Sequence, residues 1–163
     1  MINSEIKFTV FGDPKGKARP RFRRIGKFTT TYTPKETVEY ENKVKKSFKK
    51  VIDSDYKPLE GPVEAEATCF CRIPKSYSKK KREALVNTPC CTKPDTDNII
   101  KSILDPLNEI AFNDDSQVCK ISGLKLYGNL PRVEVTLKPY KNIIKPIKFV
   151  ENSKGIIKPI RFL

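Results

Sequence analysis

The chain has 163 residues, with 33 lysines and arginines against 19 acidic residues, and its formal net charge is therefore +14. The length predicts one domain, and the basic excess suits a protein that acts on a polyphosphate. Histidine is absent, which excludes Ser-His-Asp and Cys-His nucleophilic schemes and leaves carboxylates, lysines or a metal-activated water for any catalysis.

The compartment can also be predicted from the sequence. No apolar run reaches membrane-spanning length and the first residues are charged and alternating, so we expect a cytoplasmic protein with no membrane partner. Five cysteines are an odd number, which favours reduced thiols. A four-thiolate zinc site is the less favoured alternative, because its spacing does not suit zinc: Cys69, Cys71, Cys90 and Cys91.

The first elements are a strand and a basic segment. Ile6, Phe8 and Val10 alternate with polar residues and predict a half-buried strand. The segment from 15 to 27 contains no acid, and we expect a mobile loop that contacts DNA phosphates. A solvated loop that only raises solubility is the alternative. The candidate DNA-binding residues of the segment are Lys15, Lys17, Arg19, Arg21, Arg23, Arg24 and Lys27.

Two helices and a strand are predicted next. Thr33 to Glu36 forms a capping box with Pro34 at the first helical position, followed by an apolar stripe. The stripe consists of Val38, Val44, Phe48 and either Val51 or Ile52. Residues 63–73 alternate strictly and predict a strand. Ser78 can cap a short basic helix to about Leu85, whose candidate DNA-binding residues are Lys79, Lys80 and Lys81.

The segment from 93 to 117, KPDTDNIIKSILDPLNEIAFNDDSQ, holds five aspartates within this basic chain. Apolar residues recur at helical steps after Asp97, which we therefore expect at the N-cap, with its charge favoured by the helix dipole. Asp95 lies two residues earlier, so in an extended connection both carboxylates leave the backbone on the same side. Lys101 and Asp105 continue a polar stripe from Asp97.

The end of this segment brings in two more acids. Pro106 predicts a kink or an early helix end near Asp105, and residues 113–116 predict a turn that carries Asp114 and Asp115. Carboxylates crowded together resist joint ionisation unless a cation lies between them, and Mg²⁺ prefers such oxygen ligands. The pattern therefore predicts a divalent-metal site.

The stretch KPDTDNIIKSILDPLNEIAFNDDSQV resembles the signature of the RusA-like endodeoxyribonucleases, dimeric Holliday-junction resolvases of bacteria and their phages. The resemblance lies in the order, separation and intervening helix of D-x-D-N-x-x-K and D-D-S-Q-V. It implies that Asp95, Asp97 and Asp115 are catalytic metal ligands, with Asp114 beside them, and that Lys101 is the catalytic lysine. It further implies Mg²⁺ or Mn²⁺, four-way DNA junctions, a role in recombination and repair, and a homodimer.

Two strands and a tail are predicted beyond this stretch. Residues 118–127 and 132–137 are joined by a turn at Gly128-Asn129, with a bulge expected at Ser122-Gly123. The nuclease domain is expected to span 1–138. The basic tail, 139–163, carries the near-repeat IIKPI[KR]F and has no counterpart in the resemblance.

The sequence thus predicts an α/β fold of the α+β type, with a mixed, mostly antiparallel sheet of about four strands backed by helices. The predicted function is Mg²⁺-dependent, structure-selective cleavage of Holliday junctions and other branched DNA. A non-catalytic DNA-binding protein of the same fold is the first alternative. A restriction-type metal nuclease is the second, less favoured because Glu134 lacks a lysine two residues later.

Overall fold

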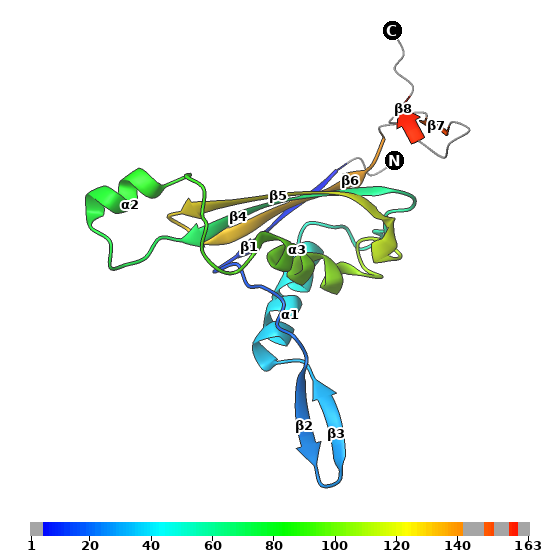
Figure 1. Ribbon diagram of the computed structural model, residues 1–163, viewed down its shortest axis with the longest axis horizontal. Coiled ribbons are helices and arrows are strands. Elements are labelled where there is room, and N and C mark those ends of the chain that lie inside the picture. Colours follow the sequence, from blue (N-terminus) through cyan, green and yellow to red (C-terminus); the bar gives the residue numbers. More distant parts are fainter. Residues whose placement is uncertain (1–4, 142–148, 152–156, 160–163) are drawn as a thin grey trace.

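A four-stranded mixed sheet forms the centre of the molecule (Figure 1). A computed structural model describes residues 5–141, 149–151 and 157–159. The strands, in spatial order, are β1 (Ile6–Phe11), β6 (Arg132–Pro139), β4 (Val63–Arg72) and β5 (Val118–Gly128). β6 runs antiparallel to both β1 and β4, whereas β4 and β5 are parallel. The predicted mixed, mostly antiparallel sheet is confirmed.

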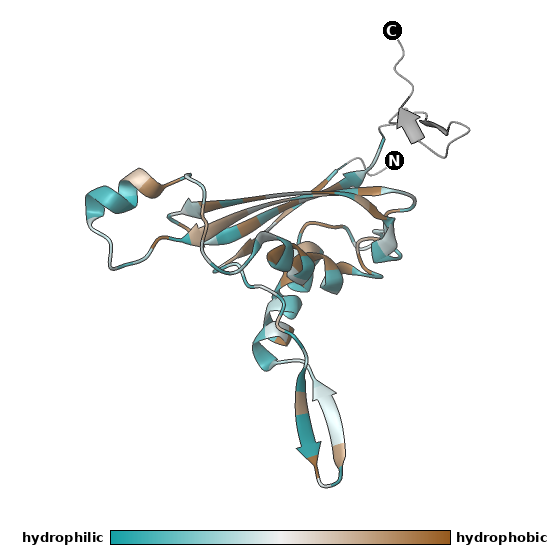
Figure 2. Ribbon diagram, viewed as in Figure 1, coloured by the Kyte–Doolittle hydropathy of each residue, from teal (hydrophilic) through white to brown (hydrophobic). Residues whose placement is uncertain are grey.

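Two helices cover one face of this sheet, α1 (Lys35–Lys49) and α3 (Thr96–Leu104) (Figure 1). Val44 and Phe48 of α1 and Ile99 and Ile103 of α3 are buried in the same core as the inward side chains of the strands. Burial of each such side chain contributes about 1.5–3 kcal/mol to folding. The third helix, α2 (Lys79–Leu85), lies apart from this layer and is mainly hydrophilic (Figures 1 and 2).

The start of α1 differs from the prediction. Thr33 forms no capping box: Pro34 itself occupies the N-cap with ψ of 140°, and no side chain caps the helix. The apolar stripe also differs: the buried face includes Tyr40, whereas Val38 is 41% exposed. Because Pro34 is extended, the helix begins at Lys35, one residue later than the capping box predicted. The predicted cap at Ser78 of α2 is confirmed, since its side chain accepts a hydrogen bond from Lys81 N.

The predicted bulge in β5 is wrong in position. The register of β4 and β5 shifts at Cys119, opposite Val63 and Glu64, and not at Gly123. Gly123 has another purpose, because a Cβ there would lie 2.6 Å from Ile100 Cδ1 on α3. The glycine allows α3 to pack closely on β5. β5 and β6 are both strands as expected, but β4 lies between them.

The basic segment is a hairpin rather than a loop. β2 (Arg21–Ile25) pairs antiparallel with β3 (Phe28–Tyr32), and all ten residues are exposed. Gly26 has φ of 61° at the first position of the two-residue connection, as a type II′ turn requires. The hairpin projects away from the sheet beyond α1 (Figure 1).

The predicted tail contains two short strands, β7 (Phe149–Glu151) and β8 (Ile157–Pro159), which pair antiparallel. Most of the near-repeat lies outside the described residues. The boundary between domain and tail therefore stays a prediction.

Candidate active site

The acidic segment begins at α3, whose N-cap differs from the predicted one. The N-cap is Asp95, in extended conformation with ψ of 147°, and Asp97 lies in the first helical turn. The N-cap assignment of Asp97 is therefore wrong, because helical dihedrals start at Thr96. Asp97 still stands at the positive end of the helix dipole, which favours its negative charge.

The two faces of α3 have opposite character. Ile99, Ile100, Ile103 and Leu104 are buried against the sheet and α1. Polar positions three or four apart therefore emerge together on the other side. The helix ends at Leu104, and Pro106 lies in a short 3₁₀ turn, η1 (Asp105–Leu107), which confirms the expected early end.

The second acidic segment is held by a capping box that the sequence analysis did not identify. In η2 (Asp115–Gln117), the carboxylate of Asp114 accepts from Ser116 N at 2.8 Å, and Gln117 Oε1 accepts from Asp114 N at 2.9 Å. Gln117 Nε2 also donates to the carbonyls of Leu59 and Gly61, at 3.0 and 2.8 Å. The D-x-x-Q spacing was the available signal. This network fixes the turn that presents Asp115.

The two segments meet at one pocket of about 320 Å³. Asp97, Lys101 and Asp105 of the α3 segment line it together with Asp115 of η2. The remaining lining is apolar: Ile100, Leu104, Val118 and Ile121. This pocket, called the α3–η2 pocket below, therefore places three carboxylates and one ammonium group around an apolar floor.

Asp95 and Asp114 do not line the α3–η2 pocket. Lys93 Nζ donates to Asp95 at 2.7 Å and holds the pKa of this exposed carboxyl below its usual value. The hydrogen bond from Ser116 likewise lowers the pKa of Asp114. Lys125 of β5, also missed by the sequence analysis, donates to the carbonyls of Thr92 and Pro94 at 2.6 and 2.8 Å. These two hydrogen bonds attach the segment before Asp95 to β5.

The segment before the hairpin is attached to α3. Ser102 Oγ donates to the carbonyl of Lys15 at 2.6 Å, and Lys17 N donates to the carbonyl of Asn98 at 3.2 Å. Ser102 is only 1% exposed, so this contact is part of the core. The base of the hairpin is therefore tied to the helix that carries Asp97.

Lys17, one of the predicted DNA-binding residues, is engaged inside the protein. Its ammonium pairs with the carboxylate of Asp105 and lies 3.4 Å from that of Glu41. Partial burial alone lowers the pKa of Lys17, but the hydrogen bond and charge of Asp105, with the charge of Glu41, raise it above its usual value. Lys17 therefore stays charged and neutralises one of the acids at the α3–η2 pocket.

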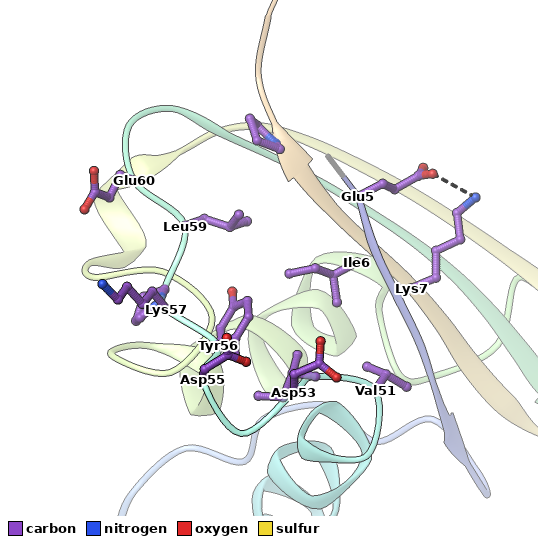
Figure 3. A pocket seen from close by; sticks show the side chains of 13 residues that line it. Glu5, Ile6, Lys7, Val51, Asp53, Asp55, Tyr56, Lys57, Leu59 and Glu60 are labelled. Carbon is purple, nitrogen blue, oxygen red and sulfur yellow. Dashed lines mark ion pairs between the residues drawn. The ribbon is translucent and has the colours of Figure 1, made fainter. Parts of the chain in front are cut away.

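A second acidic pocket lies between β1 and the connection from α1 to β4. It has about 700 Å³ and is lined by the carboxylates of Glu5, Asp53, Asp55 and Glu60. Figure 3 shows these side chains, with Glu5 paired to Lys7 at 3.1 Å. None of the predicted site residues lies there.

Comparison with protein families identifies the chain. The model of the family described as endodeoxyribonuclease RusA matches residues 12–138. The chain belongs to the RusA endodeoxyribonuclease family. It is also 36% identical over 142 residues to YqaN of Bacillus subtilis (strain 168), an uncharacterized protein, covering 82% of this chain and 95% of YqaN. Family membership confirms the resemblance and supports a DNA-cleaving enzyme from a family of Holliday-junction resolvases.

The carboxylates of this RusA-family chain fit a hard divalent cation in chemistry. Asp97, Asp105 and Asp115 supply only oxygen ligands, the kind that Mg²⁺ prefers. Within the described ranges, however, no three His, Cys, Asp or Glu side chains converge closely enough to hold an ion. Carboxylates repel one another when no cation lies between them. Two of the five aspartates, Asp95 and Asp105, pair with lysines instead.

Of the remaining predicted DNA-binding residues, Lys15 pairs with Glu36 at 3.3 Å and the others lie on two separate basic surfaces. Arg19, the hairpin arginines and Lys27 are exposed on or beside β2. Lys79, Lys80 and Lys81 are exposed at the start of α2.

Cys69 and Cys71 are buried as expected for strand thiols, and all five cysteines are free. None of the helices in the described ranges has the length and hydropathy for a membrane crossing.

Proposed function

We propose that this RusA-family chain cleaves four-way DNA junctions and related branched DNA, with Mg²⁺ as cofactor and Mn²⁺ as a substitute. The observation that carries the proposal is the α3–η2 pocket, where carboxylates from two segments meet beside Lys101. Each segment alone has a structural explanation as a helix start or a turn. Their meeting at one pocket in a chain of charge +14 suits a site that acts on a phosphodiester.

Asp95, Asp97 and Asp115 are the proposed metal ligands. A bound divalent cation would lower the pKa of an attacking water and neutralise charge on the scissile phosphate. Asp95 would exchange its ion pair with the exposed Lys93 for the cation. Asp114 keeps one oxygen on Ser116 N, and its contribution to metal binding stays a prediction.

Lys101 is the proposed electrostatic partner of the reacting phosphate. Its side chain lines the same pocket as Asp97 and Asp115 and forms no ion pair within the described ranges. A fixed positive charge there stabilises the charge that develops on the phosphate oxygens during cleavage. Lys101 therefore acts on the rate rather than on DNA affinity.

Family membership suggests the substrate and the active unit, and the arrangement of charge is compatible with both. The basic hairpin and the start of α2 would hold DNA arms through their phosphates, which makes binding depend on salt. Resolution of a junction needs two paired cuts, and a two-fold homodimer presents two equivalent sites. The homodimer is proposed on this ground and on family membership.

A cleavage assay tests this function. Wild-type protein is incubated with Mg²⁺ and either a synthetic four-way junction or a linear duplex of the same arm sequence. We expect the junction to be cut and the duplex to be left intact. Tight binding of the junction without cleavage in either Mg²⁺ or Mn²⁺ would instead support the non-catalytic DNA-binding protein.

A further inference from the structure

The hairpin of β2 and β3 exposes an unusual amount of apolar surface. Phe22 and Phe28 are 76% and 77% exposed, and Ile25 and Tyr32 are 55% and 45% exposed. So much exposed apolar surface on a projecting hairpin suggests that part of it is covered by a partner.

The register separates these side chains into two faces. Residues directly opposite in an antiparallel pair share a face, and successive residues alternate. Ile25 is opposite Phe28 at the end of the hairpin, so their side chains form one apolar cluster, called the tip pair below. Arg23 and Arg21 follow on the same face. Phe22 lies on the other face.

The charge around the tip pair indicates the chemistry of the partner. The hairpin carries Arg21, Arg23, Arg24 and Lys27 and no acid. None of these four forms an ion pair with any part of the chain that the structure describes, and Arg24 makes only a hydrogen bond to the carbonyl of Gly26. A partner that offers both many negative charges and flat apolar surfaces is DNA with exposed bases.

The base of the hairpin lies beside the helix that carries the proposed catalytic residues. Its base is anchored on α3 by the contacts from Ser102 and Asn98 to the segment at Lys15 to Lys17. The same helix carries Asp97 and Lys101. An arm that begins at the site and extends away from it can reach DNA next to the phosphate being cut.

We propose that the tip pair, Ile25 and Phe28, enters the branch point of bound DNA and stacks on bases that it opens there. This inference rests on the proposed function, because the hairpin would be a second contact with the same branched DNA substrate. Apolar wedges unstack bases at a cost that is smallest where pairing is already interrupted. Arg21 and Arg23 on the same face would hold the adjacent phosphates. The hairpin thereby favours junctions over continuous duplex.

The test uses 2-aminopurine, whose fluorescence rises when it is unstacked, placed at the branch point of a synthetic junction. Binding is measured with Ca²⁺ in place of Mg²⁺. We expect wild-type protein to raise the fluorescence and Phe28→Ser to remove most of the rise. Phe28→Ser should also slow junction cleavage roughly tenfold, by the loss of one stacked base. Ile25→Ser should act in the same direction with a smaller effect.

The matched control is Phe22→Ser, which removes the same side chain at the same exposure from the other face of the hairpin. It should leave both the fluorescence rise and the cleavage rate within about twofold of wild type. Circular dichroism checks the fold of each variant. An equal loss in Phe22→Ser would overturn the assignment to the tip pair.

The outcomes separate this inference from the proposed function. Wild-type protein that cuts junctions without a fluorescence rise would overturn the inference alone. Wild-type protein that neither binds nor cuts branched DNA would overturn both. If Phe28→Ser instead changes the sedimentation of the DNA-free protein and leaves the fluorescence rise intact, the tip pair is a protein contact and the inference is wrong.

Discussion

Two acidic pockets interrupt the basic surface of this protein, and both combine carboxylates with lysines and apolar side chains. The larger one takes most of its carboxylates from the single connection between α1 and β4. The α3–η2 pocket is less than half its volume, and its charged side chains all come from the stretch of sequence that resembles the RusA signature. The comparison teaches that neither volume nor lining chemistry alone distinguishes the two pockets, whereas the order and spacing of the acids along the chain do.

The largest expected effect comes from the acids. Asp97→Asn and Asp115→Asn should each reduce junction cleavage roughly a thousandfold, because each removes a proposed ligand of the metal. The rate is measured by single-turnover cleavage with saturating protein. Asp55→Asn, which removes a carboxylate of the larger pocket, should retain a rate within about twofold of wild type. A reversal of these results would exchange the roles of the two pockets.

The lysines give the next largest effect. Lys101→Met should slow cleavage roughly a hundredfold while junction affinity changes only a few-fold, because the charge acts on the developing phosphate charge. The matched control is Lys57→Met at the larger pocket, for which we expect no change in rate. Rate and affinity are measured separately, by single-turnover kinetics and by titration of labelled junction. A loss confined to affinity would assign Lys101 to DNA binding instead.

Much of the α3–η2 pocket was accessible from the sequence, and the reasons are local. The polar stripe of Asp97, Lys101 and Asp105 follows from helical spacing, and the end of α3 follows from Pro106. Both are confirmed by the structure. The order and separation of the D-x-D-N-x-x-K and D-D-S-Q-V motifs were sufficient to indicate the RusA family. The alternation of residues was sufficient for the strands of the sheet, but not for their order.

The missed features depend on residues far apart in the sequence. Lys17 pairs with Asp105 across 88 positions, and Gln117 reaches Leu59 across 58. No local period encodes such contacts. The parallel pairing of β4 with β5 and the close approach at Gly123 have the same origin. The hairpin was missed because charged residues occupy both faces of β2, which removes the alternation by which strands are recognised.

The effect of Mg²⁺ on stability also distinguishes the two pockets. Mg²⁺ at a hundredfold excess over its dissociation constant should add about 2.7 kcal/mol to the free energy of unfolding. For a domain of this size the melting temperature should rise by about 5–10 °C. The rise should vanish in Asp97→Asn and persist in Asp55→Asn, as measured by thermal unfolding with and without Mg²⁺. A rise retained in Asp97→Asn would place the stabilising ion elsewhere.

The smallest expected effects concern how each pocket is held. Gln117→Met removes the contacts that fix η2 and should cost about 1 kcal/mol of stability and roughly tenfold in cleavage rate, because Asp115 is displaced. Tyr56→Phe removes a 2.8 Å hydrogen bond to the carbonyl of Ala111 at the larger pocket. It should cost similar stability with no change in rate. Denaturant unfolding and cleavage kinetics together distinguish the two variants.

The central claim is that acids of α3 and η2 hold one divalent ion between them. Crystals soaked in Mn²⁺ and measured at its absorption edge test this most directly. The account predicts an anomalous peak in the α3–η2 pocket, within bonding distance of Asp97 and Asp115. A peak confined to the larger pocket, or no peak in crystals of protein that cuts junctions with Mn²⁺, would contradict it.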